Sequence, residues 1–331
     1  MEKRPDVNSI VSQYLPGRTC TIHPLSGGHL SEVYRVDLSD GQLILRVRPE
    51  VFRREHVQAD HALLAYLSNR GFPSPSVVST PGGDGHVVAS DGRLCEMLQY
   101  IPHDGTLSDG FPMLEQVASL LGRFHRLTRQ YPHVIGKPDY VGRIPITPRS
   151  KYFCGPLDRG VPRYERGAGR ELRAVLERLK ARLLRLHSLL PALDFSGQVV
   201  NHNDFYGDNL LTTGRELVGL IDFDFCLTGS HLIDLAEALY ASMIYRSSAD
   251  PFWGLDPGRG IDGGAGREFL RIYEDESGLV AARPLLGSML ELKVISLVFY
   301  PGFILAESPE MRLETLQRAQ NTVESLGDLN L

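Results

Sequence analysis

Residues 200–236 read V-N-H-N-D-F-Y-G-D-N-L-L-T-T-G-R-E-L-V-G-L-I-D-F-D-F-C-L-T-G-S-H-L-I-D-L-A, and this stretch decides the fold. His202, Asp204 and Asn209 stand at the spacing H-x-D-x-x-x-x-N. A short apolar run follows Asn209, then a Thr-Thr-Gly turn signal, and then a second apolar run that ends at Asp222. Two such runs around a turn predict a β-hairpin. We expect the hairpin to bring Asn209 beside Asp222.

The side chains at the mouth of this hairpin suit a metal site. The amide oxygen of Asn209 and the carboxylate of Asp222 are hard oxygen ligands, which magnesium prefers when it also holds nucleotide phosphates. Asp204 would stand across from the metal, where it could orient a substrate hydroxyl and accept its proton. His202 belongs to the same catalytic motif, and bracing of the loop by hydrogen bonds is its favoured role. Each piece alone is more often a solvated loop, but the joint pattern is rare by chance.

Composition places the chain among ordinary globular proteins. It has 331 residues, 42% hydrophobic and 23% charged, enough for one large or two modest domains. A net charge of -5 argues against nucleic-acid binding by bulk electrostatics, because that requires a basic face. The four cysteines form no C-x-x-C pair, which favours free thiols in a reducing compartment. Neither a signal peptide nor a membrane span is expected, so we predict a cytoplasmic protein without membrane contact.

The first hundred residues carry strand and turn signals. Apolar runs at 33–38 and 43–47 flank a Ser-Asp-Gly turn, and a second such hairpin is expected over 86–98. A helix is favoured over 53–69 between the two hairpins. These elements predict an antiparallel sheet with one packed helix.

A glycine-containing loop precedes the first hairpin. Ser26, Gly27, Gly28 and Ser31 lie where backbone amides could approach an anion closely. Paired glycines alone are a weak signal, since neither of the common phosphate-loop motifs is present. Arg46 lies among apolar residues of the next expected strand, so it is a candidate phosphate partner. The alternative is an ordinary exposed arginine.

The chain becomes mainly helical after residue 100. A helix is predicted over 114–127, a loop-rich region over 134–161, and an arginine-rich helix over 170–190 that we interpret as a surface helix rather than a membrane-binding one. A glycine-rich mobile loop is expected over 254–266. Further helices are predicted over 233–245, 268–276, 285–300 and 310–326. The domain prediction is 1–100 and 101–331, joined by a hinge near 100–105.

The ordered series of glycine loop, cationic strand, helix, hinge, H-x-D-x-x-x-x-N, I-D-F-D and D-L-A resembles the aminoglycoside phosphotransferase and choline kinase superfamily, small-molecule relatives of protein kinases. The resemblance extends over about residues 25–245 and is specific over 200–236. It implies an α+β, protein-kinase-like bilobal fold. Residues 1–100 would form the nucleotide-binding lobe and 101–331 a larger helical lobe with the catalytic loop and acceptor site.

The resemblance also implies roles for single residues. Asp204 would be the catalytic base, and Asn209 and Asp222 would bind Mg²⁺. Arg46 occupies the place of the phosphate-binding lysine. The stretch from Gln99 to Ile101 would form the adenine-binding hinge, with ATP or another nucleoside triphosphate as the cofactor.

Several positions depart from the family pattern. Arg46 keeps the charge of the usual lysine but presents a planar fork. Its acidic helix partner has no clean match; we expect Asp60, with Glu55 as the alternative. The catalytic loop reads H-N-D, which is familiar from choline and ethanolamine kinases, rather than the H-G-D common in antibiotic kinases. Asp208 and Asp224 add carboxylates that could hold a second metal or bind a substrate ammonium group.

The sequence therefore predicts an ATP- and Mg²⁺-dependent O-phosphotransferase that acts on a hydroxyl of a small molecule. The acceptor could be an aminoglycoside or another amine-bearing antibiotic or metabolite, including choline, ethanolamine or homoserine. A bacterial Ser/Thr protein kinase is an alternative, and a non-catalytic nucleotide-binding module is another. Acceptor identity, ATP against GTP, and oligomeric state are left open.

The charge of the acceptor depends on which residues line the pocket. We expect a cationic acceptor, because many carboxylates follow Asp204 in the sequence. These are Asp208, Asp222, Asp224, Asp234, Glu237, Asp250, Asp256 and Asp262. A basic segment could instead accept an anionic group, and it comprises Arg149, Lys151, Arg159, Arg163, Arg166, Arg170 and Arg173.

Overall fold

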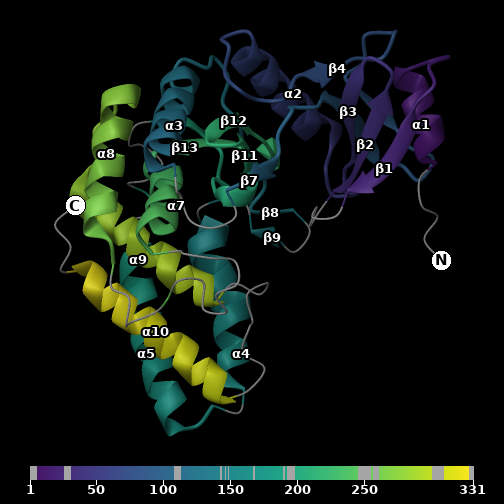
Figure 1. Ribbon diagram of the computed structural model, residues 1–331. Helices are drawn as coiled ribbons and strands as arrows, with labels where there is room; N and C mark the ends of the chain where they lie inside the picture. The colour runs from purple at the N-terminus through teal and green to yellow at the C-terminus, as the bar shows by residue number, and fades with distance from the viewer. Residues whose placement is uncertain are drawn as a thin grey trace. The chain divides into compact units, whose positions relative to one another are not determined.

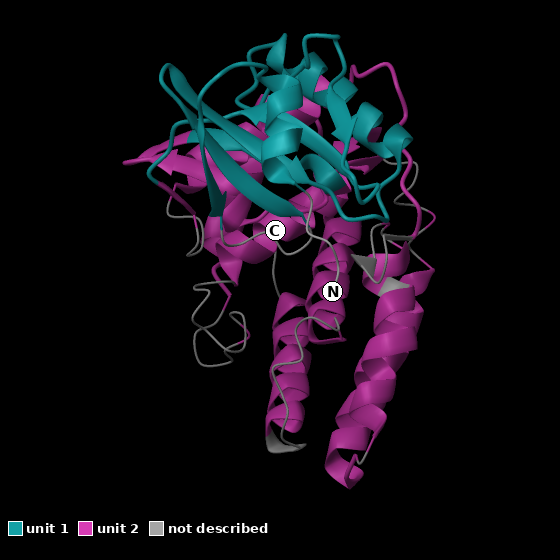
Figure 2. Ribbon diagram, turned by 90° about the vertical axis from the view of Figure 1, so that its right-hand side faces the viewer, with its two compact units in different colours: residues 1–104, 218–224 teal, residues 105–217, 225–331 magenta. Residues whose placement is uncertain are grey.

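The computed structural model describes residues 6–25, 31–107, 113–141, 144–145, 147, 149–166, 168–188, 191, 198–244, 255, 261–299 and 309–327. The chain forms two compact units (Figure 2). Unit 1 comprises Met1–Asp104 and Val218–Asp224, and unit 2 comprises Gly105–Leu217 and Phe225–Leu331. The expected glycine loop at Ser26, Gly27 and Gly28 lies outside the described residues.

An antiparallel sheet dominates unit 1 (Figure 1). Its strands run in the order β1-β2-β3-β6-β4, and β5 pairs with β6. Leu38 pairs with Gly41, which makes the first predicted hairpin a two-residue turn. The strands are β1 (Thr21–Leu25), β2 (Glu32–Leu38), β3 (Gly41–Val47), β4 (Val77–Val78), β5 (His86–Val88) and β6 (Leu94–Gln99).

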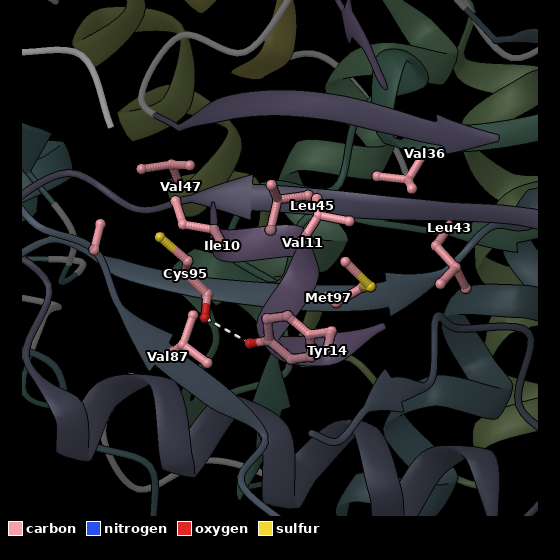
Figure 3. Close-up of a cluster of buried hydrophobic side chains, with 11 residues drawn as sticks. Ile10, Val11, Tyr14, Val36, Leu43, Leu45, Val47, Val87, Cys95 and Met97 are labelled. Carbon is pink, nitrogen blue, oxygen red and sulfur yellow. Dashed lines mark hydrogen bonds between the residues drawn. The ribbon is translucent and has the colours of Figure 1, made fainter. Parts of the chain in front are cut away.

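Helices α1 (Val7–Tyr14) and α2 (Arg54–Ser68) pack on this sheet. Ile10, Val11 and Tyr14 of α1 join a buried cluster with apolar residues of the sheet (Figure 3). The Tyr14 hydroxyl donates to the Cys95 carbonyl at 2.8 Å. The prediction of a single packed helix was incomplete, because the sequence signal of the eight-residue α1 is short and only its Asp6 cap marks its start.

Strand alternation sets the polarity of β3. Leu43, Leu45 and Val47 face the cluster that contains α1. Arg46, and Arg48 just beyond the strand, therefore point to the opposite face. Arg48 pairs there with Asp60 of α2. The two arginines thus lie on the face of the sheet on the side of α2.

Unit 2 is mainly helical, as predicted. Helix α7 (Leu232–Met243) is buried along its whole length. It packs against α8 and α9, while α3 packs against α8, and α10 against α5 and α9 (Figure 1). These partners are α3 (Leu114–Thr128), α5 (Arg170–His187), α8 (Gly263–Ser277), α9 (Arg283–Phe299) and α10 (Pro309–Gly327). No helix in the described ranges is long and apolar enough to cross a membrane.

The region predicted to be loop-rich, 134–161, contains more regular structure than expected. Strands β8 (Tyr140–Val141) and β9 (Ile144–Pro145) form a small hairpin. Two π-helical turns follow, η1 (Ser150–Cys154) and η2 (Pro156–Gly160), before the short helix α4 (Val161–Glu165). The prolines and glycines of this region fit such irregular turns, so breaker residues alone gave a misleading signal.

The decisive stretch forms two small sheets. Strand β10 (Gln198–Asn201) leads into the catalytic motif and pairs with β13 (Leu227–Ser230). The predicted hairpin is confirmed: β11 (Leu210–Thr213) lies beside β12 (Glu216–Leu220), with β7 (Gly105–Thr106) on its other side. Short 3₁₀ turns, η3 (Gly207–Asn209) and η4 (Phe223–Phe225), flank the hairpin.

Candidate active site

A carboxylate of α7 holds the loop that follows β10 through hydrogen bonds. Asp234 is fully buried in the first turn of that helix. Its Oδ2 accepts the backbone N–H of His202 at 2.6 Å, and its Oδ1 accepts the backbone N–H of Asn203 at 2.7 Å. Two charge-assisted bonds to consecutive amides leave the backbone before Asp204 little freedom. Asp234 belongs to the D-L-A motif and to the acidic residues that follow Asp204, but neither signal predicts this role.

A second layer of polar groups holds Asp234. His125 of α3 is fully buried, and its Nε2 lies 3.1 Å from Asp234 Oδ2. Its Nδ1 lies 2.8 Å from the hydroxyl of Tyr273. Because a carboxylate oxygen accepts, Nε2 carries a proton, and in the neutral imidazole Nδ1 would accept from the Tyr273 hydroxyl. Three helices, α3, α7 and α8, thus meet beneath the loop.

Asn203 has a backbone conformation that explains the unusual letter in H-N-D. Its φ is +61°, in the left-handed region. Glycine adopts this region freely, and asparagine is among the few other residues that tolerate it. The choice between H-G-D and H-N-D is therefore a choice between the two residues best suited to this geometry.

Asp204 lies in contact with Asn209 within the loop. The Asn209 Nδ2 donates to the Asp204 carbonyl at 2.9 Å and to Asp204 Oδ2 at 3.0 Å. With the amide nitrogen directed to Asp204, the amide oxygen of Asn209 points away from it. Asp208, between them in sequence, is exposed on η3.

His202 has a different environment from Asp204. The side chain is fully buried, and its ring lies edge-on to those of Phe124 and Phe205, with both centroid distances 6.3 Å. A ring enclosed by aromatic side chains suits a group that supports the loop. Bracing therefore stays our proposal for this residue.

Unit 1 contains a buried network of charges. Arg46 contacts Asp224 Oδ2 at 2.6 Å, Asp222 Oδ1 at 3.2 Å and Glu96 Oε1 at 3.3 Å. Arg48 contacts Glu96 at 2.7 Å and Asp224 Oδ1 at 2.8 Å. Arg46 is only 12% exposed, so it is no ordinary surface arginine.

Asp60 was expected to pair with Arg46 but pairs with Arg48 instead. Asp60 lies 3.2 Å from Arg48, while Glu96 on β6 contacts both arginines. Arg46 and Arg48 lie on the same face of the sheet. Arg48 is two residues further along the chain, and it is Arg48 that contacts Asp60 of α2. The alternative, Glu55, is exposed and pairs with Arg53 at 3.9 Å. Glu96 interrupts the apolar run 94–98, and a charged residue within such a run was the sequence signal for a buried ion pair.

These contacts shift the ionisation of the acids. Burial opposes ionisation of Glu96, but the arginines and His61 lower its pKa well below the usual value. Partial burial and the neighbouring Asp224 carboxylate raise the pKa of Asp222 to about 6. Asp224 itself is buried and its pKa is lowered by Arg46 and Arg48, against the effect of burial. Asp224 is thus committed to arginines, which argues against its binding a substrate ammonium group.

Asp222 also has a left-handed backbone, with φ +65°. It and Asn203 are the two non-glycine residues with positive φ in the described part of the chain. Such conformations cost roughly 1–3 kcal/mol and concentrate at functional sites. The Asp222 side chain is 37% exposed, so its carboxylate is accessible.

The donor set fits a magnesium–nucleotide complex. Among the described residues, no group of three or more His, Cys, Asp or Glu side chains could hold a metal. Mg²⁺ commonly uses one or two protein oxygens and completes its shell with water and phosphate oxygens. The Asn209 amide oxygen and the Asp222 carboxylate are ligands of that kind. That the two converge on one ion stays a prediction.

The remaining predicted nucleotide contacts lie in unit 1. Ser31 precedes β2, and its buried hydroxyl has no hydrogen-bond partner among the described residues. The exposed Gln99 ends β6, and its backbone N–H donates to Ser76 O at 2.8 Å. The carbonyl of Ile101 lies 2.8 Å from His103 Nδ1. Their roles in nucleotide binding stay proposals.

Comparison with known proteins places this geometry in a family. The model of the phosphotransferase enzyme family matches residues 21–273. A homoserine kinase from Pseudomonas aeruginosa (strain UCBPP-PA14) is 28% identical over 264 residues, which cover 78% of this chain and 74% of that protein.

Solved structures share the fold. An aminoglycoside phosphotransferase from Alicyclobacillus acidocaldarius has 15% identity and a TM-score of 0.66, with 99% of this chain and 95% of that chain covered. The microcompartment-associated aminopropanol kinase has 19% identity and a TM-score of 0.66, with 95% and 93% covered. The predicted α+β, protein-kinase-like fold is confirmed, and so is the prediction of a small-molecule kinase. The chain belongs to the phosphotransferase enzyme family.

Proposed function

We propose that the protein transfers the terminal phosphoryl group of Mg²⁺-bound ATP to the hydroxyl of a small amine-bearing acceptor of the homoserine or amino-alcohol type. The observation that carries this proposal is the fixed Asp204 loop in a chain of the phosphotransferase family. Relatives named homoserine kinase and a structural neighbour named aminopropanol kinase support the choice of acceptor. Both names denote short compounds that carry an amine and a hydroxyl.

In this proposal Asp204 would accept the proton of the acceptor hydroxyl while the hydroxyl oxygen attacks the terminal phosphoryl group of ATP. Asn209 binds one carboxylate oxygen of Asp204, which orients the other toward an incoming hydroxyl. Asp234 keeps the preceding amides in place, so the carboxylate does not have to reorganise during the reaction. Positioning of this kind supplies much of the rate in phosphoryl transfer.

The nucleotide would be held by residues of both the loop and the charge network. The Asn209 amide oxygen and the Asp222 carboxylate would bind Mg²⁺, which neutralises developing charge on the phosphate oxygens. Arg46 would contact the phosphates. Ion pairs with Asp222 and Asp224 hold the Arg46 guanidinium in a single position. Phosphate binding would therefore replace one of these carboxylates by a phosphate oxygen as a partner of Arg46.

The test is an ADP-formation assay over homoserine, 3-amino-1-propanol, choline and an aminoglycoside. We expect turnover of a short amino compound, and an Asp204→Asn variant with kcat reduced roughly 100-fold or more while ATP binding is retained. Asp275→Asn is the matched control, because Asp275 is an exposed carboxylate of α8 outside the catalytic loop. Near-normal kcat in the Asp204 variant would contradict the base assignment, and absence of turnover with any acceptor would contradict the function.

A further inference from the structure

Two lysines share one buried carboxylate beside the catalytic loop. Glu237 of α7 is 5% exposed, and its Oε1 pairs with the ammonium groups of Lys151 and Lys293, the latter at 3.2 Å. Lys151 comes from the π-helical turn η1, and Lys293 comes from α9. π-helical turns occur often at functional sites, because they redirect a single side chain.

The lysines lie close to the reacting position. Lys151 Nζ donates to the backbone carbonyl of Asn203 at 2.7 Å, one residue before Asp204. Burial lowers the pKa of Lys293, and the Glu237 and Asp204 carboxylates oppose that shift. Glu237 also accepts the backbone N–H of Phe205, one residue after Asp204, at 3.3 Å. The cluster therefore borders the catalytic residue on both sides in sequence.

Lys151 and Lys293 together carry one positive charge more than Glu237 neutralises. Both side chains retain some exposure, 17% for Lys151 and 18% for Lys293. The cluster thus offers partly accessible positive charge beside Asp204.

The acidic residues expected to attract a cation have other partners in the structure. Asp234 binds the loop backbone, Glu237 binds the two lysines, and Asp262 accepts the N–H of Ala265 at the start of α8. Asp250 and Asp256 lie outside the described residues. Asp234, Glu237 and Asp262 are therefore engaged by groups of the protein itself.

We propose that Lys151 and Lys293 form a subsite for an anionic group, a carboxylate, carried by the acceptor close to its reacting hydroxyl. This inference rests on the proposed function and specifies its acceptor as a hydroxy amino acid rather than a simple amino alcohol. An acceptor carboxylate would take the place of water at the exposed side of the two ammonium groups. Charge-assisted contacts of this kind are short and orienting, so they would also direct the hydroxyl toward Asp204.

The experiment compares two acceptors that differ only in the carboxylate. L-Homoserine and 3-amino-1-propanol have the same hydroxyl, carbon spacing and amine, and only homoserine carries the acid group. The variant is Lys293→Met, which leaves Glu237 its Lys151 partner and leaves the Asn203 carbonyl its donor. Lys180→Met is the control, because this lysine of α5 pairs with Glu165 and Glu177 away from the loop.

For the wild-type enzyme we expect kcat/KM to favour homoserine by roughly 10- to 100-fold, as for the loss of a charged hydrogen bond. The Lys293→Met variant should lose most of that preference through KM for homoserine, with kcat/KM for aminopropanol within about twofold. Equal losses for both acceptors would show a purely structural role and overturn the proposal. So would a wild-type enzyme that prefers aminopropanol.

A binding measurement separates this proposal from the proposed function. Calorimetric titration with each acceptor does not depend on phosphoryl transfer. If no acceptor supported ADP formation, the function would fail, yet tighter binding of homoserine that Lys293→Met abolishes would still support the subsite. Equal binding of the two acceptors to wild-type protein would overturn the subsite even if both were phosphorylated.

Discussion

Replacement of Asp234 by asparagine tests whether α7 holds the catalytic loop. The carboxylate serves two backbone amides, those of His202 and Asn203, and the ring of His125. An amide has a single acceptor oxygen, so its NH₂ group must face one of the two backbone N–H groups. One charge-assisted bond is lost and one buried donor is left unsatisfied, and together these changes lower the free energy of unfolding by about 2–4 kcal/mol.

Stability and activity should both report this loss. At about 2–4 °C per kcal/mol for chains of this size class, Tm should fall by roughly 5–15 °C. If the amide nitrogen faces Asn203, the left-handed φ at that residue loses its support and Asp204 shifts. A shift of about 1 Å reduces kcat roughly 100-fold, with little change in KM for ATP.

The assay combines thermal unfolding with steady-state kinetics for both substrates. Asp262→Asn is the matched control, because Asp262 accepts one backbone N–H as the N-cap of α8 and asparagine caps equally well. A variant at Asp234 with Tm within about 1 °C and kcat within about twofold of wild type would refute the reasoning, since two short bonds cannot be exchanged for one without cost.

Three further changes test other parts of the site. Asp222→Ala should weaken Mg²⁺–ATP binding by roughly tenfold or more in a nucleotide titration, because a charged ligand is removed from the metal; unchanged affinity would exclude Asp222 as a ligand. Asn203→Gly should keep activity, whereas Asn203→Val should lower the free energy of unfolding by about 1–2 kcal/mol, since a β-branched residue resists positive φ; equal stability in urea would contradict this. Although burial opposes its ionisation, Lys151 and Lys293 lower the pKa of Glu237 from 4.5 to about 2. The resulting stability is present above pH 4.5 and lost as pH falls toward 2, so urea unfolding of Glu237→Gln should depend less on pH in that window, and identical pH profiles would disprove the pairing.

The fold class and the location of the site were predictable because their signals are local. The turn between the two apolar runs after Asn209 fixes the hairpin, and the two Asp-Gly turns fix the hairpins of unit 1. Spacing within residues 200–236 also determined which side chains the loop presents. Such patterns depend on neighbours a few residues apart, and every residue needed to read them stands in the same stretch.

The partners of the charged residues were decided only by tertiary structure. Asp60 pairs with Arg48 because strand direction and helix position bring those two together, and no local pattern distinguishes Arg48 from Arg46. Asp234 serves amides 31 and 32 residues away, and His125 reaches it across 109 residues. The sequence by itself determined the catalytic motif and its hairpin. Which carboxylates stay available to a ligand was settled by long-range packing, because a buried charge takes whichever opposite charge the fold places within reach.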